Sequence, residues 1–144
     1  MAGSPIDRPS SLREEARVLA LVAMGAIPGA LLRWRLEELG KALVGGLAGL
    51  SQADLAANLL GSFLIGVIAA LPGPRARLML FGGIGFCGSL TTFSGWILQI
   101  SLAVRRGRFL EALAVLMVSL VGGLAAVALG LLAGRRLGRG GLRR

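Results

Sequence analysis

Residues 82–96 read GGIGFCGSLTTFSGW and lie at the centre of an uncharged, apolar run that extends from residue 78 to residue 104. The run is long enough to cross a lipid bilayer as a helix. Five glycines between Gly82 and Gly95 weaken that helix at a depth where no water can bond a freed backbone carbonyl. We therefore expect a transmembrane helix broken at the membrane midplane, with the break buried in protein or lining a polar cavity. Broken helices at this depth are where transporters and channels bind ions.

The composition is that of a multi-pass membrane protein. Hydrophobic residues make up 55% of the 144 residues, and the mean hydropathy is +0.77. Four apolar runs reach the roughly 17 to 25 residues that a spanning helix needs: residues 18–34, 55–71, 78–104 and 112–134. We expect an all-α protein of the cell (inner) membrane, with a polar N-terminal segment (residues 1–16), a four-helix transmembrane domain (17–134) and a basic C-terminal tail (135–144).

Charge and residue usage exclude several functions. The net charge is +9, but the basic residues flank the apolar runs, which is typical of contact with lipid headgroups rather than with nucleic acid. The chain has no histidine and one cysteine, so metal-ligand clusters and Cys/His catalysis are excluded and we expect no enzyme. No Asp or Glu lies inside a span, since Asp54 is at a boundary and Glu111 precedes the fourth run. This disfavours a proton-coupled antiporter.

Local patterns predict details of the bundle. Residues 11–14 match a capping box, so a helix should begin there. Residues 42–50 are too short to cross the membrane and are either an interfacial or re-entrant segment or an early extension of the second span. Small residues recur at helical spacing in every span and should form helix contact faces, which also implies an oligomer. Pro28 should kink the first span.

The few polar side chains inside the spans outline an uncharged path. Asn58 and Ser62 are four residues apart and point the same way, and Ser119 lies in the fourth run. Amide and hydroxyl groups donate hydrogen bonds to an anion, and aromatic rings present a positive edge to one. As an alternative, Asn58 could simply bond a neighbouring helix. For Ser62 and Ser119, we expect hydrogen bonds back to their own helices rather than a place in this path.

These residues resemble the CrcB/Fluc family of fluoride channels. Residues 85–94, GFCGSLTTFS, look like the family's third-helix signature GFxGGxTTFSTF, and residues 58–66, NLLGSFLIG, are similar to its second-helix NxxGSFxxG. Residues 25–33 echo its first-helix GxxxGxxxR, and Ser119 followed by two glycines is a loose match to the fourth helix.

The resemblance implies an antiparallel dimer of four-helix subunits, with two fluoride pores and one sodium ion at its centre. By the same resemblance, the backbone carbonyls of Gly88 and Thr91 would bind sodium, and Arg33 would stand near a pore entrance. The residues implied to form the fluoride pore are Asn58, Phe93, Ser94, Trp96 and Ser119.

The sequence departs from the family pattern near the implied pore. Trp96 replaces a phenylalanine, Gly95 a threonine and Gln99 a glutamate, whereas Asp54 stands at a position that is commonly threonine. In the fourth span Val115 replaces a tyrosine. A homodimer and a heterodimer with a homologous subunit of opposite orientation both remain open.

The function that follows is a passive fluoride channel that exports the ion from the cytoplasm and lowers its concentration there. One alternative is a small four-helix multidrug exporter, although residues 18–32 lack the carboxylate that such a protein should carry. Another is a non-conducting partner subunit of a heterodimeric channel. Of the 16 Lys and Arg residues, ten fall on the side of the two termini and six on the other, which favours both termini inside and a separately encoded partner over dual topology.

Overall fold

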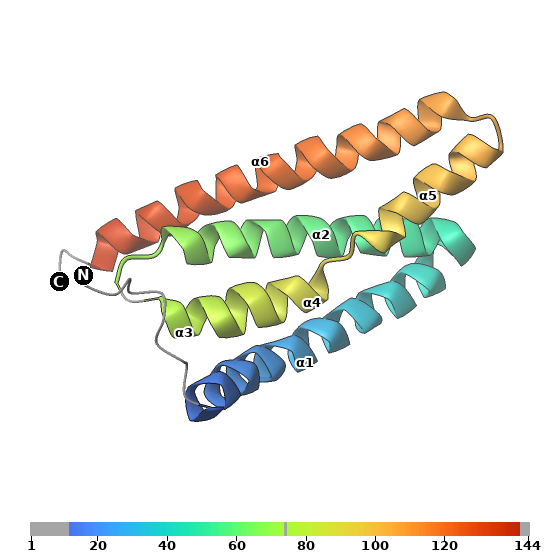
Figure 1. Cartoon of the computed structure of the whole chain (residues 1–144). Helices are drawn as coiled ribbons and strands as arrows, with labels where there is room; N and C mark the ends of the chain where they lie inside the picture. Colours follow the sequence, from blue (N-terminus) through green and yellow to red (C-terminus); the bar gives the residue numbers. More distant parts are fainter. Residues whose placement is uncertain (1–11, 74, 142–144) are drawn as a thin grey trace, which may run out of the picture.

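The computed structural model describes residues 12–73 and 75–141 of the chain, and every element in this part is helical (Figure 1). Two long helices come first, α1 (Leu12–Leu43) and α2 (Gly46–Ala70). The third span is made of four consecutive pieces, and a long helix follows. These are α3 (Ala76–Leu78), the π-helix η1 (Met79–Cys87), α4 (Gly88–Leu90), α5 (Ser94–Arg105) and α6 (Phe109–Gly141).

Within the described residues, four helical stretches are long and apolar enough to cross a membrane: Leu12–Leu43, Gly46–Ala70, Ala76–Arg105 and Phe109–Gly138. Large apolar side chains stand on their outer faces, such as Leu124, which is 72% exposed. A face of this kind is stable against lipid rather than water. The prediction of an all-α protein with four spans is confirmed, and the chain is a multi-pass membrane protein.

The helix ends explain two of the sequence patterns. Helix α1 begins at Leu12 inside the predicted capping box, whereas Ser11 lies outside the described residues. Of the alternatives for residues 42–50, the extension of the second span is the one found, because α2 already begins at Gly46 after a short turn. That turn needs glycine, since Gly45 and Gly46 have φ angles of 83° and 52°.

The small residues are contact faces, as predicted. Helix α1 packs against η1 through Gly25 and Gly85, and α2 packs along α6 through Gly66 and Gly130. A Cβ atom added at any of these glycines would fall within 2.5 Å of a backbone carbonyl oxygen of the facing helix. Close backbone approach is how helices associate where no hydrophobic drive exists between them.

The third span does not run as one continuous helix. It is a π-helix over residues 79–87, α4 ends at Leu90, and α5 starts at Ser94. Between them, Thr91 is extended, with φ −80° and ψ 153°. The start of α1 and the end of α6 lie at one end of the bundle, and the α1–α2 and α5–α6 turns lie at the other (Figure 1).

Candidate functional site

Asn58 holds the non-helical residues 91–93 against α2. Its Nδ2 donates to the backbone carbonyl of Thr92 at 2.9 Å, and its Oδ1 accepts the backbone N–H of Thr92 at 2.7 Å. A backbone that leaves a helix inside a membrane must have its polar groups bonded, and this side chain bonds both groups of Thr92. One N–H of the Asn58 amide remains for another partner. The alternative that Asn58 bonds a neighbouring span is therefore realised, and it leaves one donor over.

Two backbone carbonyls beside this contact have no such partner. Because the Thr92 N–H goes to Asn58, it does not bond the carbonyl of Gly88, which would accept it in a continuous helix. The N–H and the hydroxyl of Thr91 both donate to the carbonyl of Cys87, at 3.0 and 2.9 Å. Within residues 12–73 and 75–141, no hydrogen bond reaches the carbonyl oxygens of Gly88 or Thr91. We call residues 91–93, which separate α4 from α5, the interruption. The backbone oxygens of Gly88, just before it, and of Thr91, at its start, are hard oxygen ligands without hydrogen-bond partners among the described residues.

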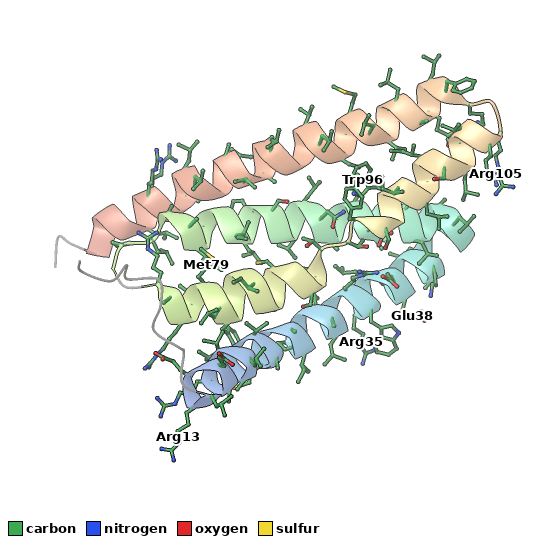
Figure 2. The ribbon with its side chains drawn as sticks, in the orientation of Figure 1. Arg13, Arg35, Glu38, Met79, Trp96 and Arg105 are labelled. Carbon is green, nitrogen blue, oxygen red and sulfur yellow. The ribbon has the colours of Figure 1, made fainter. Side chains whose placement is uncertain are left out.

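Two aromatic rings flank the interruption. Phe93 and Trp96 pack edge to face, with ring centroids 4.7 Å apart and planes at 76°. Trp96 is half-buried and points from α5 towards α6 (Figure 2), whereas Phe93 is 70% exposed. Ser94 is exposed as well, and its Oγ lies 3.1 Å from Oγ1 of Thr92.

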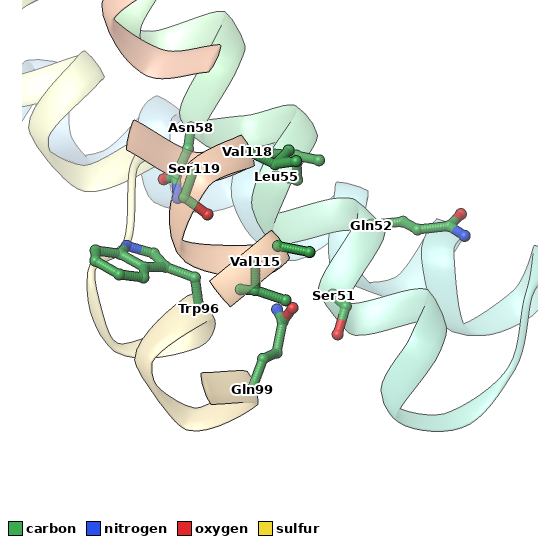
Figure 3. A pocket seen from close by; sticks show the side chains of 10 residues that line it. Ser51, Gln52, Leu55, Asn58, Trp96, Gln99, Val115, Val118 and Ser119 are labelled. Carbon is green, nitrogen blue, oxygen red and sulfur yellow. The ribbon is translucent and has the colours of Figure 1, made fainter. Parts of the chain in front are cut away.

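A cavity of about 250 Å³ lies between α2, α5 and α6, beside these rings. Figure 3 shows Asn58 of α2, Trp96 of α5 and Ser119 of α6 around the same space. Its full lining is Ser51, Gln52, Leu55, Asn58, Trp96, Gln99, Ala114, Val115, Val118 and Ser119. The lining carries polar groups but no charged side chain.

A second cavity, of about 270 Å³, continues from the first towards the interruption. The two share Asn58, Trp96 and Ser119, and the second adds Phe93 and Thr91. The structure therefore brings four of the five residues of the implied pore together. Ser94 stands apart and lines neither cavity.

Arg33 lies in a different cavity, of about 200 Å³, between α1, α2 and α5. Its Nε donates to Oε1 of Glu37 at 2.8 Å, and the guanidinium is partly exposed. Asp54 and Gln99 line the same cavity. Arg33 is thus at one mouth of the bundle, with its charge paired.

Sequence reasoning missed some of the lining and misjudged some of it. Ser51 was not singled out, although it lies seven residues before Asn58 and so on the same helical face. Gln99 stands out in the sequence only as a departure from a family pattern, yet it lines two of these cavities. The placement of Asp54 at a span boundary is wrong, because Asp54 lies inside α2, is only 9% exposed and lines the Arg33 cavity. The expectation that Ser62 and Ser119 are bonded back to their helices is wrong, because no hydrogen bond from the described part of the chain reaches either hydroxyl.

Comparison with known proteins places the chain in a family. A family model described as "CrcB-like protein, Camphor Resistance (CrcB)" matches residues 20–131. The chain belongs to the CrcB family. The third-span signature and the second-span motif around Asn58 both lie inside the matched residues.

Relatives of this CrcB chain carry the name fluoride-specific ion channel. The FluC 2 protein of Parasynechococcus marenigrum (strain WH8102) is 46% identical over 129 residues, which is 89% of each chain. Prochlorococcus marinus (strain MIT 9313) has two relatives. Its FluC 2 is 39% identical over 86% of the CrcB chain and 87% of its own length, and its FluC 1 is 36% identical over 84% and 95%.

Proposed function

We propose that this chain is a subunit of a fluoride-specific channel, which lets fluoride leave the cytoplasm across the cell membrane and thereby confers fluoride resistance. Family membership and the names of the relatives support this function. The observation that carries it is the uncharged cavity at which polar groups of Asn58, Trp96 and Ser119, from three different spans, meet beside the helix interruption. The protein is then a passive pore and not an enzyme.

The cavity offers what a small, dehydrating anion requires. One N–H of Asn58, the hydroxyl of Ser119 and the indole N–H of Trp96 are donors that bond no described residue. The edge of the Phe93 ring adds a positive surface. Because these groups are neutral, they replace water around the ion without trapping it, as conduction requires. The membrane potential, at about 2.3 kcal/mol per charge per 100 mV, drives the anion outward.

A dimer would complete this site. Phe93 is 70% exposed at the interruption, which fits a ring that a second subunit covers. An antiparallel arrangement would place two copies of residues 88–93 together at the midplane, so that each chain contributes to a shared centre.

That centre suits a sodium ion. The carbonyls of Gly88 and Thr91 are hard oxygen donors without hydrogen-bond partners in the described chain, and two subunits would supply twice as many. Gly88 is exposed, and a Cβ atom there would meet no atom nearer than the Gly83 carbonyl oxygen at 4.0 Å, so a second chain has room to approach. The bound ion would supply structural charge between the subunits and take no part in fluoride movement.

A heterodimer is the second form of this proposal. One Prochlorococcus marinus strain has both a FluC 1 and a FluC 2 relative, and the Lys and Arg bias of this chain favours one orientation. The partner would then be a homologous subunit inserted the opposite way.

Fluoride efflux from liposomes that contain the purified protein alone tests the proposal. We expect release of fluoride but not of chloride after the membrane potential is short-circuited with a potassium ionophore. Silence that a co-reconstituted homologous subunit relieves would support the heterodimer. Transport of a cationic drug without fluoride release would instead favour an exporter.

A further inference from the structure

Two further cavities share lining residues with the cavity that contains Asn58, and their charged residues differ; we call them the Arg33 mouth and the Arg106 mouth. The Arg33 cavity lies between α1, α2 and α5, and a further cavity of about 210 Å³, which contains Arg106, lies between α2, α5 and α6. Both share Ser51 and Gln99 with the cavity that contains Asn58. These two cavities are the candidate routes between Asn58 and this end of the bundle, which is the end opposite the start of α1 (Figure 1).

The Arg33 mouth carries an uncompensated negative charge. Arg33 and Glu37 pair at 2.8 Å, and Arg33 also interacts electrostatically with Asp54, so two carboxylates share one cation at this mouth. Asp54 is only 9% exposed, and among the described residues no hydrogen bond or ion pair reaches its carboxylate. It lies one helical turn before Asn58, and such neighbours have Cβ atoms about 5–6 Å apart.

The position of the Asp54 carboxylate depends on Gly95. A Cβ atom at Gly95 would collide with this carboxylate, so any other residue there would displace it. The missing side chain in α5 keeps the negative charge beside the route to Asn58.

The other mouth carries the opposite charge. Glu111 is paired with Arg108 at 2.7 Å, so these two charges cancel. Arg106, at the end of α5, has no ion pair within the part of the chain that the structure describes. The neighbouring Arg105 does not line the cavity and points away from the bundle (Figure 2).

We propose that fluoride passes between Asn58 and this end of the bundle through the Arg106 mouth and that Asp54 excludes it from the Arg33 mouth. The inference rests on the proposed fluoride channel. In a partly buried site, the interaction energy between the ion and a unit charge a few ångströms away is large enough to select a route. An unpaired cation also raises the local concentration of an anion. Arg33 does not make this mouth attractive to an anion, because Glu37 and Asp54 together outweigh its charge.

Fluoride efflux from liposomes, with single-site variants of the full chain, tests both parts. We expect Arg106→Gln to slow efflux about tenfold and Arg106→Lys, which keeps the charge, to slow it less than Arg106→Gln does. Arg105→Gln, which removes the same charge one residue away, should change efflux less than about twofold. The loss in Arg106→Gln should shrink in high salt, which screens exposed charge. Equal rates for Arg106→Gln and Arg105→Gln would overturn the route.

The exclusion is tested by removing the charge at constant shape. We expect Asp54→Asn to raise efflux at least severalfold above the rate of the unmutated protein, whereas Asp54→Glu, which keeps the charge, should not raise it. Glu38 is an exposed acid paired with Lys41 near the same end, and Glu38→Gln should have little effect. An unchanged or lower rate in a folded Asp54→Asn protein would overturn the exclusion. No fluoride release by the unmutated protein, either alone or with a homologous subunit, would instead refute the proposed function itself.

Discussion

The amide of Asn58 uses its oxygen and one N–H to bond the backbone of Thr92, and its second N–H bonds no described residue. A substitution that removes the amide would therefore lower stability as well as remove the proposed donor to fluoride. Ser119 differs, because its hydroxyl bonds no described residue and can turn fully towards the cavity. At the scale of single residues, the site combines one side chain that is partly committed to structure with others that are free to bind.

We expect Asn58→Asp to abolish fluoride efflux and to lower stability. The carboxylate cannot donate to the Thr92 carbonyl and places a negative oxygen beside it, and an unsatisfied buried group costs about 1–3 kcal/mol. Efflux and the thermal unfolding midpoint in detergent measure the two effects. Ser62→Ala, on the same face of α2, is the control and should unfold within about 2 °C of the unmutated protein. Efflux at the unmutated rate would show that Asn58 does not line the pore.

We expect Phe93→Ile to slow efflux strongly while the subunit still folds. Isoleucine keeps the bulk but lacks the positive ring edge, and it loses the edge-to-face contact with Trp96, which is worth about 0.5–1.5 kcal/mol. Phe81→Ile on η1, away from both cavities, is the matched control. If both variants conduct equally well, Phe93 does not contact the ion.

At the scale of helices, the close α2–α6 contact fixes the width of the cavity that these two helices share with α5. Gly130 lets α6 approach so nearly that an added Cβ would collide with the carbonyl oxygen of Phe63. Ser119 is on the same helix, so its distance from Asn58 depends on this approach. Gly66 and Gly130, the glycines of the α2–α6 contact, therefore help to set the geometry of the site although they line neither cavity that contains Asn58.

We expect Gly130→Val to separate α2 from α6 and to lose both folding yield and efflux. The control is Ala128→Val on the lipid-exposed side of α6, which adds similar volume without meeting another helix. Monodispersity on size exclusion and fluoride efflux are the measurements. A Gly130→Val protein that conducts normally would mean that the contact is not needed to hold the cavity.

At the scale of the whole molecule, one chain leaves its most distinctive features uncovered. The exposed ring of Phe93 and the open surface at Gly88 lie at the same interruption, beside carbonyls without partners. A second copy or a homologous subunit would cover them. In such a dimer, some mutations would unfold a subunit, whereas others would leave the subunit folded and only prevent its association.

We expect Gly88→Leu to leave the single subunit folded but to prevent the dimer and the sodium site. Within its own chain the new side chain meets no atom closer than 4.0 Å at Cβ, so folding has no reason to fail. Cross-linking, and the dependence of stability on sodium against a large organic cation, report the assembly. A Gly88→Leu protein that still dimerises and responds to sodium would remove the case for this centre.

We expect labelling to find both termini on the cytoplasmic side. Ten Lys and Arg residues lie on that side against six on the other, and positive charge is retained in the cytoplasm. Single cysteines at Ser4 and at Gly107, in a Cys87→Ala background, can be tested with a reagent that does not cross the membrane. Equal labelling of both positions from outside would indicate dual topology and contradict a dedicated partner of opposite orientation.

Hydropathy and residue spacing were enough to predict the four spans and the glycine contact faces, because each depends on local periodicity. The cluster of Asn58, Phe93, Trp96 and Ser119 came from family resemblance, since these residues lie on three different spans. The bond from Asn58 to Thr92 joins residues 34 positions apart, and the match of Gly95 to Asp54 depends on how α2 and α5 meet. Neither has a signal in local sequence, so only the three-dimensional arrangement reveals them.

The bond between Asn58 and Thr92 also constrains how the protein is made. Residues 91–93 leave the ribosome after α2, and in lipid their unpaired backbone groups would each cost several kcal/mol. Asn58 is already present when they arrive, so the second span can act as an internal template for inserting the third. A rearranged gene in which the third span is synthesised before the second would expose that bare backbone to lipid, and the polypeptide should be retained and degraded before assembly.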